Sequence, residues 1–184
     1  NVRVQTSEDG GKTFTQLKES KKHSDNHSII FKEDDPDYIM IGTDAGIYET
    51  FDLAKNWSYI KNLPLTQFYK VAVNDAKPFY HIFGGTQDNG SAGGPSATDE
   101  REGISNRNWY KILGADGHQT ATDPEYNNIV YAETQQGGLH RVDLITGETL
   151  FIQPQAEEGD PHERFNWDAP ILVSPHDPAT LYFG

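Results

Sequence analysis

The chain has 184 residues, of which 35% are hydrophobic and 11% aromatic, so it can bury a core and is typical of globular rather than disordered proteins. Its 28 acidic and 15 basic residues give a net charge of -13, which excludes nucleic acid and anionic membrane surfaces as partners. The lack of cysteine excludes disulfides, thiol nucleophiles and cysteine zinc sites, and no apolar run approaches the roughly 18 residues of a membrane-spanning helix, which excludes membrane insertion.

The first predicted element is a tight hairpin at residues 7–14. Its sequence matches the Asp-box, S/T-x-D-x-G-x-T-W/F, at Ser7, Asp9, Gly11, Thr13 and Phe14. In such a turn the Asp carboxylate accepts backbone N–H groups, glycine supplies a positive φ, and the closing aromatic packs back between the strands. A degenerate copy follows at 50–57, where Ala54 replaces the glycine and Asn56 the threonine. This box is structural, so it predicts a fold and leaves the function open.

A longer unit repeats along the chain: a strand, a turn rich in Asp and Pro, and a second strand that ends in a small residue. The small residues are Gly42, Gly84, Ala132 and Gly184. A period of roughly 40–50 residues with short apolar runs is typical of four-stranded antiparallel propeller blades. We therefore predict an all-β chain of β-propeller blades, with inner strands near 28–31, 70–73, 119–122 and 171–173. The glycine-rich segment 88–108 is predicted to be an ordered insertion or a surface loop.

The two ends of the chain are predicted to hold incomplete blades. Residues 1–20, with strands at 2–4 and 14–17, supply third and fourth strands, and residues 165–184 supply a first and a second strand. Residues 1–184 would thus be a single propeller segment of about four blade equivalents. Either the chain is part of a larger propeller, or its ends join as one shared closing blade. We favour the segment.

The starts of the inner strands converge on one face of a propeller, so this rim is the predicted place for a site. Three carboxylates at or beside these starts are the candidates for catalysis: Asp25, Asp116 and Asp168. The candidates for ligand binding are His23, His27, Tyr69, Gln87, Asp88, Asn89, His118 and Trp167. Aspartate and histidine could bond to sugar hydroxyls, and Trp167 either stacks on a sugar or fills the core between blades.

A metal is a second interpretation of the first inner strand. His23, Asp25 and His27 alternate, so on a strand they would share one face and could bind a divalent cation. The alternative, which we favour, is a polar strand whose His and Asp bond to neighbouring blades. The loop at 86–90 could also help to hold calcium. No cofactor is required by the sequence.

Several of these segments together resemble one family. They are 7–14, 23–27, 42–48, 62–69, 85–90 and 166–170, and they are similar to bacterial sortilin-like, Asp-box (BNR-repeat) glycosyl-hydrolase-like propeller proteins. The resemblance implies a secreted or cell-envelope protein, remaining blades in a longer parent chain, and a distant relation to xyloglucanases. Ala45 departs from the usual glycine, and the second Asp-box is eroded.

The sequence is compatible with two functions. The first is an extracellular module that binds a polysaccharide or a protein ligand at the channel mouth. The alternative is a xyloglucanase-like glycoside hydrolase that uses a channel-mouth Asp pair. We favour binding, because a hydrolase would need carboxylates from blades that this chain does not contain. A sialidase is disfavoured, since arginine is scarce at the predicted rim.

Overall fold

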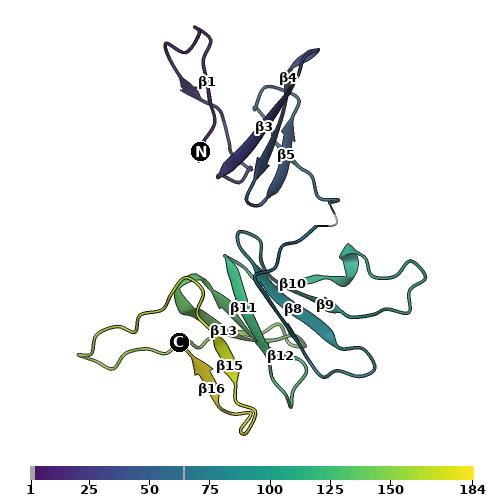
Figure 1. Cartoon of the computed structure of the whole chain (residues 1–184), viewed down its shortest axis with the longest axis vertical. Helices are drawn as coiled ribbons and strands as arrows, with labels where there is room; N and C mark the ends of the chain where they lie inside the picture. Colours follow the sequence, from purple (N-terminus) through teal and green to yellow (C-terminus); the bar gives the residue numbers. More distant parts are fainter. Residues whose placement is uncertain (1–2, 64) are drawn as a thin grey trace. The chain divides into compact units, whose positions relative to one another are not determined.

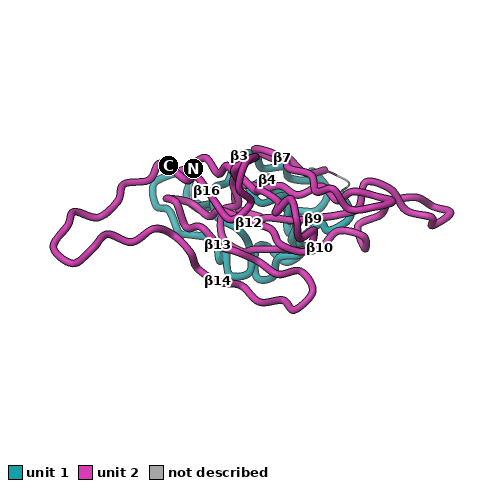
Figure 2. The backbone as a smooth tube through the Cα atoms, turned by 90° about the horizontal axis from the view of Figure 1, so that it is seen from below, with its two compact units in different colours: residues 1–64 teal, residues 65–184 magenta. Residues whose placement is uncertain are grey.

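The computed structural model describes residues 3–63 and 65–184, and all of its regular structure is β-strand apart from two short 3₁₀ turns, Asn106–Asn108 and Gln135–Gly137 (Figure 1). The chain forms two compact units, residues 1–64 and 65–184, which Figure 2 colours separately. No helix among the described residues is long and apolar enough to cross a membrane. The all-β prediction is confirmed.

Unit 1 contains a two-stranded sheet of β1 (Gln5–Thr6) and β2 (Thr15–Gln16) and a four-stranded antiparallel sheet. The four strands follow the chain in order and are β3 (Asn26–Lys32), β4 (Asp35–Thr43), β5 (Gly46–Thr50) and β6 (Ser58–Tyr59). The strand predicted at 14–17 contains β2, whereas the one predicted at 2–4 is displaced: Arg3 and Val4 precede β1 and are not in a strand, and Val2 falls outside the described residues.

Unit 2 contains two more four-stranded antiparallel sheets and a final two-stranded one. The first is β7 (Lys70–Val73), β8 (His81–Thr86), β9 (Gly90–Pro95) and β10 (Tyr110–Leu113). The second is β11 (Gly117–Thr122), β12 (Ile129–Thr134), β13 (Gly138–Asp143) and β14 (Thr149–Phe151). The last pair is β15 (Ile171–Val173) and β16 (Leu181–Phe183). These sheets do not close a ring, so the propeller itself stays a prediction.

The first strands of the three sheets in unit 2 lie side by side, with β11 in the middle. The hydroxyl of Thr122 donates to the carbonyl of Val73 at 2.9 Å, and Nε2 of Gln119 donates to the carbonyl of Ile171 at 2.8 Å. Ala121, Leu139 and Ile171 form the buried core between the second and third sheets. The predicted inner strands are therefore real strands, and within unit 2 they are neighbours.

The alternative of a surface loop at 88–108 is wrong for residues 90–95, because they form β9, which pairs with β8 and β10. Residues 96–108 contain no strand, only the short 3₁₀ turn Asn106–Asn108. Strand β9 consists of Gly-Ser-Ala-Gly-Gly-Pro, which has low intrinsic strand propensity. Bulky rings from neighbouring positions fill the space that its side chains would take. A Cβ on Gly93 would lie 2.6 Å from a ring carbon of Phe83, and one on Gly94 would lie 2.7 Å from the Trp109 ring. Packing on aromatic rings has overridden local propensity.

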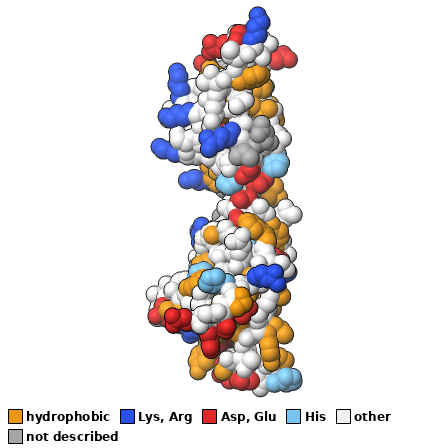
Figure 3. Space-filling view, turned by 90° about the vertical axis from the view of Figure 1, so that its left-hand side faces the viewer, with side chains coloured by type: hydrophobic (Ala, Val, Ile, Leu, Met, Phe, Trp, Pro, Cys, Tyr) orange, Lys and Arg blue, Asp and Glu red, His pale blue; other side chains and the backbone are white. Residues whose placement is uncertain are grey.

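Every sheet except the β1–β2 pair also presents hydrophobic side chains to the surface; hydrophobic side chains are orange on the face drawn in Figure 3. On the first strands, Ile30, Val71, Val73 and Leu172 are all more than half exposed. A sheet that is buried on both faces alternates less strictly between apolar and polar residues than one with a wet face. These strands therefore carry apolar side chains that no described neighbouring segment buries.

Two turns in unit 1 use the same hydrogen bonds. Oδ1 of Asp9 accepts the backbone N–H groups of Lys12 and Thr13, both at 2.9 Å, and its Oδ2 accepts the Thr13 hydroxyl at 2.7 Å. The expectation that Asp9 accepts backbone N–H groups is confirmed. These bonds lower the pKa of Asp9 to about 2, chiefly through the Thr13 N–H.

The second turn repeats this pattern around Asp52, although its sequence is degenerate. Its carboxylate accepts the backbone N–H of Asn56 at 2.9 Å and the Asn56 side-chain amide at 2.7 Å, which lower the pKa of Asp52 to about 2. Ala54 takes a left-handed φ of 65° where Gly11 has 87°. The side-chain amide of Asn56 thus donates to the Asp52 carboxylate as the Thr13 hydroxyl donates to Asp9 in the first turn.

The two turns differ in what their closing aromatic does. Trp57 is buried among Ile39, Ile41 and Ala54, and its Nε1 donates to the carbonyl of Lys18 at 2.8 Å. Phe14 is 62% exposed, so the expectation that it packs back between strands is wrong. Only the second turn is tied to the core of unit 1.

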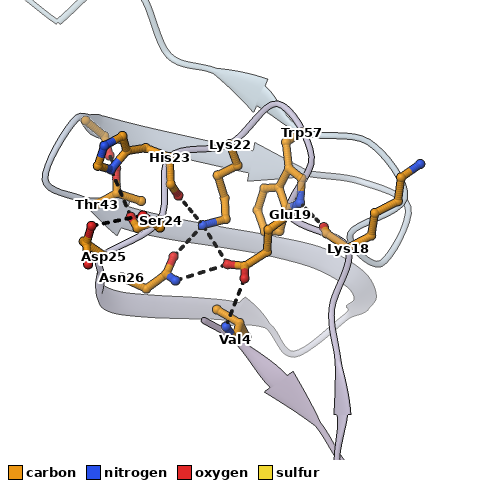
Figure 4. A network of polar contacts seen from close by, with 11 residues as sticks. Val4, Lys18, Glu19, Lys22, His23, Ser24, Asp25, Asn26, Thr43 and Trp57 are labelled. Carbon is orange, nitrogen blue, oxygen red and sulfur yellow. Dashed lines mark hydrogen bonds and ion pairs between the residues drawn. The ribbon is translucent and has the colours of Figure 1, made fainter. Parts of the chain in front are cut away.

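A buried lysine joins the start of β3 to the residues that follow β2 (Figure 4). The Lys22 side chain is fully buried, and its Nζ lies 2.9 Å from Oε1 of Glu19. The same ammonium donates to Oδ1 of Asn26 at 2.6 Å and to the carbonyl of His23 at 2.7 Å. Asn26 in turn donates to Glu19 at 3.1 Å. A buried charge is tolerated only with such partners, so this network fixes the local path of the chain.

We expect Asp52→Ala to lower the melting temperature of the protein more than Asp9→Ala. Both variants lose turn hydrogen bonds, but only the Asp52 turn holds Trp57 and Ala54 in the core. The measurement is thermal unfolding by circular dichroism, with hydrogen exchange of residues 46–60 to localise the loss. Asp34→Ala, at an exposed turn position, is the control. Equal melting temperatures for the two variants would contradict this.

We expect Lys22→Met to destabilise unit 1 by roughly 3–5 kcal/mol, because it leaves the Glu19 carboxylate buried without its cation. Chemical denaturation gives the free energy of unfolding. The matched control is Lys18→Met, since Lys18 has an exposed side chain and contributes only its backbone carbonyl. A Lys22→Met protein within about 0.5 kcal/mol of wild type would show that the network contributes no stability.

Candidate functional site

The residues proposed as metal ligands in unit 1 do not share a strand face. Strand β3 begins at Asn26, and Asp25 before it has a left-handed φ of 52°, which breaks the expected alternation. Nδ1 of His23 contacts the carbonyl of Ser24, whereas Nε2 of His27 pairs with the carboxylate of Asp44. Within the described ranges, no group of three or more His, Asp or Glu side chains is arranged to hold a metal ion. The expectation of a shared metal-binding face was wrong.

In unit 2 the loops at the starts of β7, β11 and β15 come together with the β8–β9 turn. The backbone N–H of Asp88 donates to Oδ1 of Asp116 at 2.8 Å, and the backbone N–H of Asp116 donates to Oε1 of Gln135 at 3.2 Å. The Tyr69 hydroxyl bonds to Oε1 of Gln87. We name the residues gathered here the rim cluster: Tyr69, Lys70, Gln87, Asp88, Asp116, His118, Trp167 and Asp168.

Three rings form the centre of the rim cluster. The His118 ring stacks on Tyr69 with centroids 5.2 Å apart and planes 6° apart, and the Trp167 ring meets it edge-on at 5.8 Å. His118 is fully buried, while Tyr69 and Trp167 are each 47% exposed. The histidine is thus a buried spacer between two aromatic side chains that still present surface to solvent.

One cation stands among the carboxylates of the rim cluster. Nζ of Lys70 lies 3.0 Å from Oδ2 of Asp168. Burial lowers the pKa of His118 below its ordinary value, and the charges of Asp168 and Asp116 offset only part of this effect. His118 is therefore neutral at pH 7, and the rim cluster carries more negative than positive charge.

Glu133 is a fully buried carboxyl group beside the rim cluster that sequence reasoning missed. Its Oε1 accepts the backbone N–H of Ala169 at 2.6 Å. Burial raises its pKa to about 7, and the negative charge of Asp168 adds to the rise. The repeat alignment held a signal, because Glu133 follows Ala132 at the position where the other copies have Thr43 and Gly85.

Several buried polar atoms of unit 2 lack a hydrogen-bond partner among the described residues. They are Oγ of Ser91, both ring nitrogens of His118, Oγ1 of Thr120, Oε2 of Glu133 and Oδ1 of Asp168. Buried polar atoms are normally paired with protein or ordered water. These atoms lie in or beside the strands that carry the rim cluster. Water or a ligand is expected to supply their hydrogen bonds.

The backbones of β8 and β11 approach each other closely beneath these side chains. A Cβ on Gly85 of β8 would lie 2.2 Å from the carbonyl oxygen of His118 and 2.4 Å from the carbonyl carbon of Gly117, both on β11. One on Gly117 would lie 2.5 Å from the backbone of Gly90, at the start of β9. Only glycine fits at such a distance. The carbonyl of Gly85 also accepts the backbone N–H of Tyr69 at 3.0 Å. Gly85 therefore sets the spacing between Tyr69 and His118.

The remaining predicted site residues fall into two groups. Asn89 is exposed in the β8–β9 turn, where its side-chain amide donates to the carbonyl of Gln87 at 3.5 Å. His23, Asp25 and His27 belong to unit 1. A pocket of about 630 Å³ in unit 2 is lined by other residues, among them Asn74, His81, Tyr110 and Asp143. None of the rim-cluster residues lines that pocket.

Comparisons with known proteins give little beyond this geometry. No protein-family model matches the chain, and no curated protein matches it. Among solved structures, the chain is similar to the crystal structure of the Niastella koreensis GH74 (NkGH74) enzyme, with 13% sequence identity and a TM-score of 0.40. The match covers 97% of this chain and 29% of that one, so the chain spans less than a third of its length. A likeness at this level carries no argument about activity.

We expect Gly85→Ala to destabilise unit 2 by about 1–3 kcal/mol, because the added methyl group has no room against the His118 backbone. The same change should move the ring resonances of His118 as its stacking on Tyr69 is disturbed. Denaturation curves and proton NMR measure the two effects. Gly114→Ala is the control, since nothing lies within 4 Å of its added Cβ. If both variants melt alike, the close approach is not a constraint.

Proposed function

We propose that unit 2 binds a glycan at the rim cluster. The observation that carries this proposal is the pair of half-exposed rings, Tyr69 and Trp167, held on either side of the buried His118 ring. Aromatic faces of this kind present a large apolar surface that is ordered in advance, so little conformational entropy is lost when a flat ligand stacks on them.

Polar groups around the rings suit a ligand rich in hydroxyl groups. Gln87 and Asp88 lie on the Tyr69 side, and Lys70 and Asp168 lie near Trp167 and His118. Carboxylates accept hydrogen bonds from sugar hydroxyls, and lysine and amide groups donate them. The excess of negative charge favours neutral sugars over uronic or sulfated ones by Coulomb repulsion.

Glycoside hydrolysis is the second candidate, and one observation favours it. The raised pKa of Glu133 keeps a proton on this carboxyl group near neutral pH, and the carboxylate of Asp168 is close enough to affect it. A general acid paired with an ionised carboxylate is what glycosidases require. Glu133 is fully buried, however, and a general acid must reach the glycosidic oxygen, so binding is the better account.

The wider setting of the site is also a proposal. The two Asp-box-like turns and the ordered four-stranded sheets support a place for this chain in a β-propeller, with further blades as its partners. The resemblance of the turn motifs to Asp-box proteins supports a secreted or cell-envelope location. A wild type that binds no glycan would favour a protein ligand in place of a glycan.

We expect Trp167→Ala and Tyr69→Ala each to weaken glycan binding by about tenfold, because each removes one stacking face. A glycan microarray identifies the ligand, and calorimetry then measures Kd for the wild type and both variants. Tyr126→Ala, at an exposed ring outside the rim cluster, is the control and should bind normally. Unchanged affinity in both rim variants, or no glycan bound by the wild type, would refute the proposal. Release of reducing sugar by the wild type, abolished in Asp168→Asn, would favour hydrolysis.

A further inference from the structure

Two hairpins of the chain share one design. β5 and β6 are the third and fourth strands of the four-stranded sheet in unit 1, and β13 and β14 hold the same places in the second sheet of unit 2. Tyr48 pairs with Tyr59 across the first hairpin, with ring centroids 5.0 Å apart. His140 pairs with Phe151 across the second, with centroids 5.2 Å apart. Because these ring pairs match, the two hairpins can be compared residue by residue.

The comparison makes Thr149 the counterpart of Trp57, since each stands two residues before the ring of the fourth strand. Trp57 belongs to the buried core of unit 1, and Val4 and Leu17, which flank the β1–β2 pair, pack against that core. Its Nε1 donates to the carbonyl of Lys18 at 2.8 Å. The indole ring thus fills the space between its own sheet and the preceding strand pair, and the smaller side chain of a threonine cannot.

The pocket of about 630 Å³ in unit 2 lies at this threonine. Thr149 and its cross-strand partner Val142 contribute to one side of the pocket. Tyr110 and Ile112 on the other side belong to β10, which is the last strand of the preceding sheet, as β2 is the last strand before the sheet in unit 1. The pocket therefore corresponds in place to the indole ring of Trp57.

Hydrogen bonds between lining residues hold the frame of the pocket. Nδ2 of Asn74 donates to the carbonyl of Asn127 at 3.0 Å, and Oδ1 of Asn74 accepts the backbone N–H of His81 at 2.7 Å. Nδ2 of Asn128 donates to Oδ1 of Asp143 at 2.9 Å. These bonds tie the β7–β8, β11–β12 and β13–β14 turns to one another. The pocket is therefore formed in advance, and little ordering is needed when a ligand binds.

The lining suits a neutral ring with a polar substituent. Asp143 and Lys111 contribute one charge of each sign, so neither sign dominates. The Tyr110 hydroxyl and the Asn127 amide can bond to a polar group at the edge of a ring. Ile145 is 80% exposed, so no described segment buries this part of the lining. The apolar lining residues are Ala76, Ile112, Val142, Leu144 and Ile145.

We propose that this pocket binds a neutral aromatic group of the size of an indole, in the place that Trp57 fills in unit 1. A free aromatic molecule and a tryptophan side chain of another polypeptide present the same chemistry, and the test separates these two sources. The inference goes beyond the proposed glycan binding and does not depend on it, since the pocket and the rim cluster share no residue.

The test adds indole to the full chain labelled with ¹³C at its methyl groups. We expect the methyl resonances of Val142, Leu144 and Ile145 to shift in a saturable way, with a Kd of about 1 mM or tighter. Thr149→Trp should weaken this binding at least tenfold, because its tethered ring occupies the pocket. Leu150→Trp is the matched control: it adds the same ring on the opposite face of β14 and should bind indole as the wild type does.

Three results would overturn the inference: no saturable shift in the wild type, shifts at Tyr69, His118 and Trp167 in place of the pocket, or equal affinity of Thr149→Trp and the wild type. Loss of binding in both tryptophan variants would also overturn it, since the effect would then not come from filling the pocket. Should Thr149→Trp not fold, the map of shifted methyl groups in the wild type decides.

The source of the ring is identified with a second probe, N-acetyl-tryptophanamide, which carries a peptide group on each side of the tryptophan. Binding at least as tight as that of indole indicates the side chain of another polypeptide, because the pocket then accommodates the flanking backbone. Weaker binding indicates a free aromatic molecule. Failure of the glycan microarray alone would refute the proposed function and leave this inference standing.

Discussion

The contact between the backbones of β8 and β11 is the constraint on which the rest of unit 2 depends. Sheets usually pack through their side chains at about 10 Å, but a glycine on each side lets these strands approach much more closely. The approach places His118 where Tyr69 can stack on it and where no water reaches it. The aromatic arrangement, the low pKa of His118 and the crowding of polar atoms at this end all follow from it.

The two units manage buried polar groups differently. In unit 1 the Lys22 ammonium is paired with the Glu19 carboxylate and donates to the His23 carbonyl and to Asn26. This network stabilises one path of the chain. In unit 2 the ring nitrogens of His118 and one oxygen each of Glu133 and Asp168 lack partners among the described atoms. An unsatisfied buried group costs free energy, roughly 1–3 kcal/mol each. Buried polar atoms of this kind are normally paired with ordered water or with a bound molecule.

The repeat in the sequence was enough to place the sheets, because each strand pair is short, apolar and closed by an Asp or Pro turn. It did not find β9, since Gly90–Pro95 has no strand-forming side chains and depends on rings elsewhere in the sequence. Tyr69, His118 and Trp167 were predicted to meet because they stand at strand starts, and they do. Glu133 was not predicted, because its burial and its hydrogen bond to the N–H of Ala169, 36 residues further along the chain, depend on the tertiary structure.

The turn carboxylates have a consequence for how the protein behaves in solution. Asp143 at the end of β13 accepts the Asn128 side-chain amide and the Ile145 backbone N–H, both at 2.9 Å. Asp9, Asp52 and Asp143 all have pKa values of about 2, so the stability that they contribute is present above pH 3.8 and is lost as the pH falls through 2. Glu133 contributes in the opposite sense and favours the folded state most below 4.5. The four groups together stabilise the fold best between about pH 4 and 5, which includes the isoelectric point of about 4.8. The folded state is thus most stable near the pH at which the net charge vanishes and molecules repel each other least. Purification at that pH would therefore favour the folded state but lower the solubility of the protein.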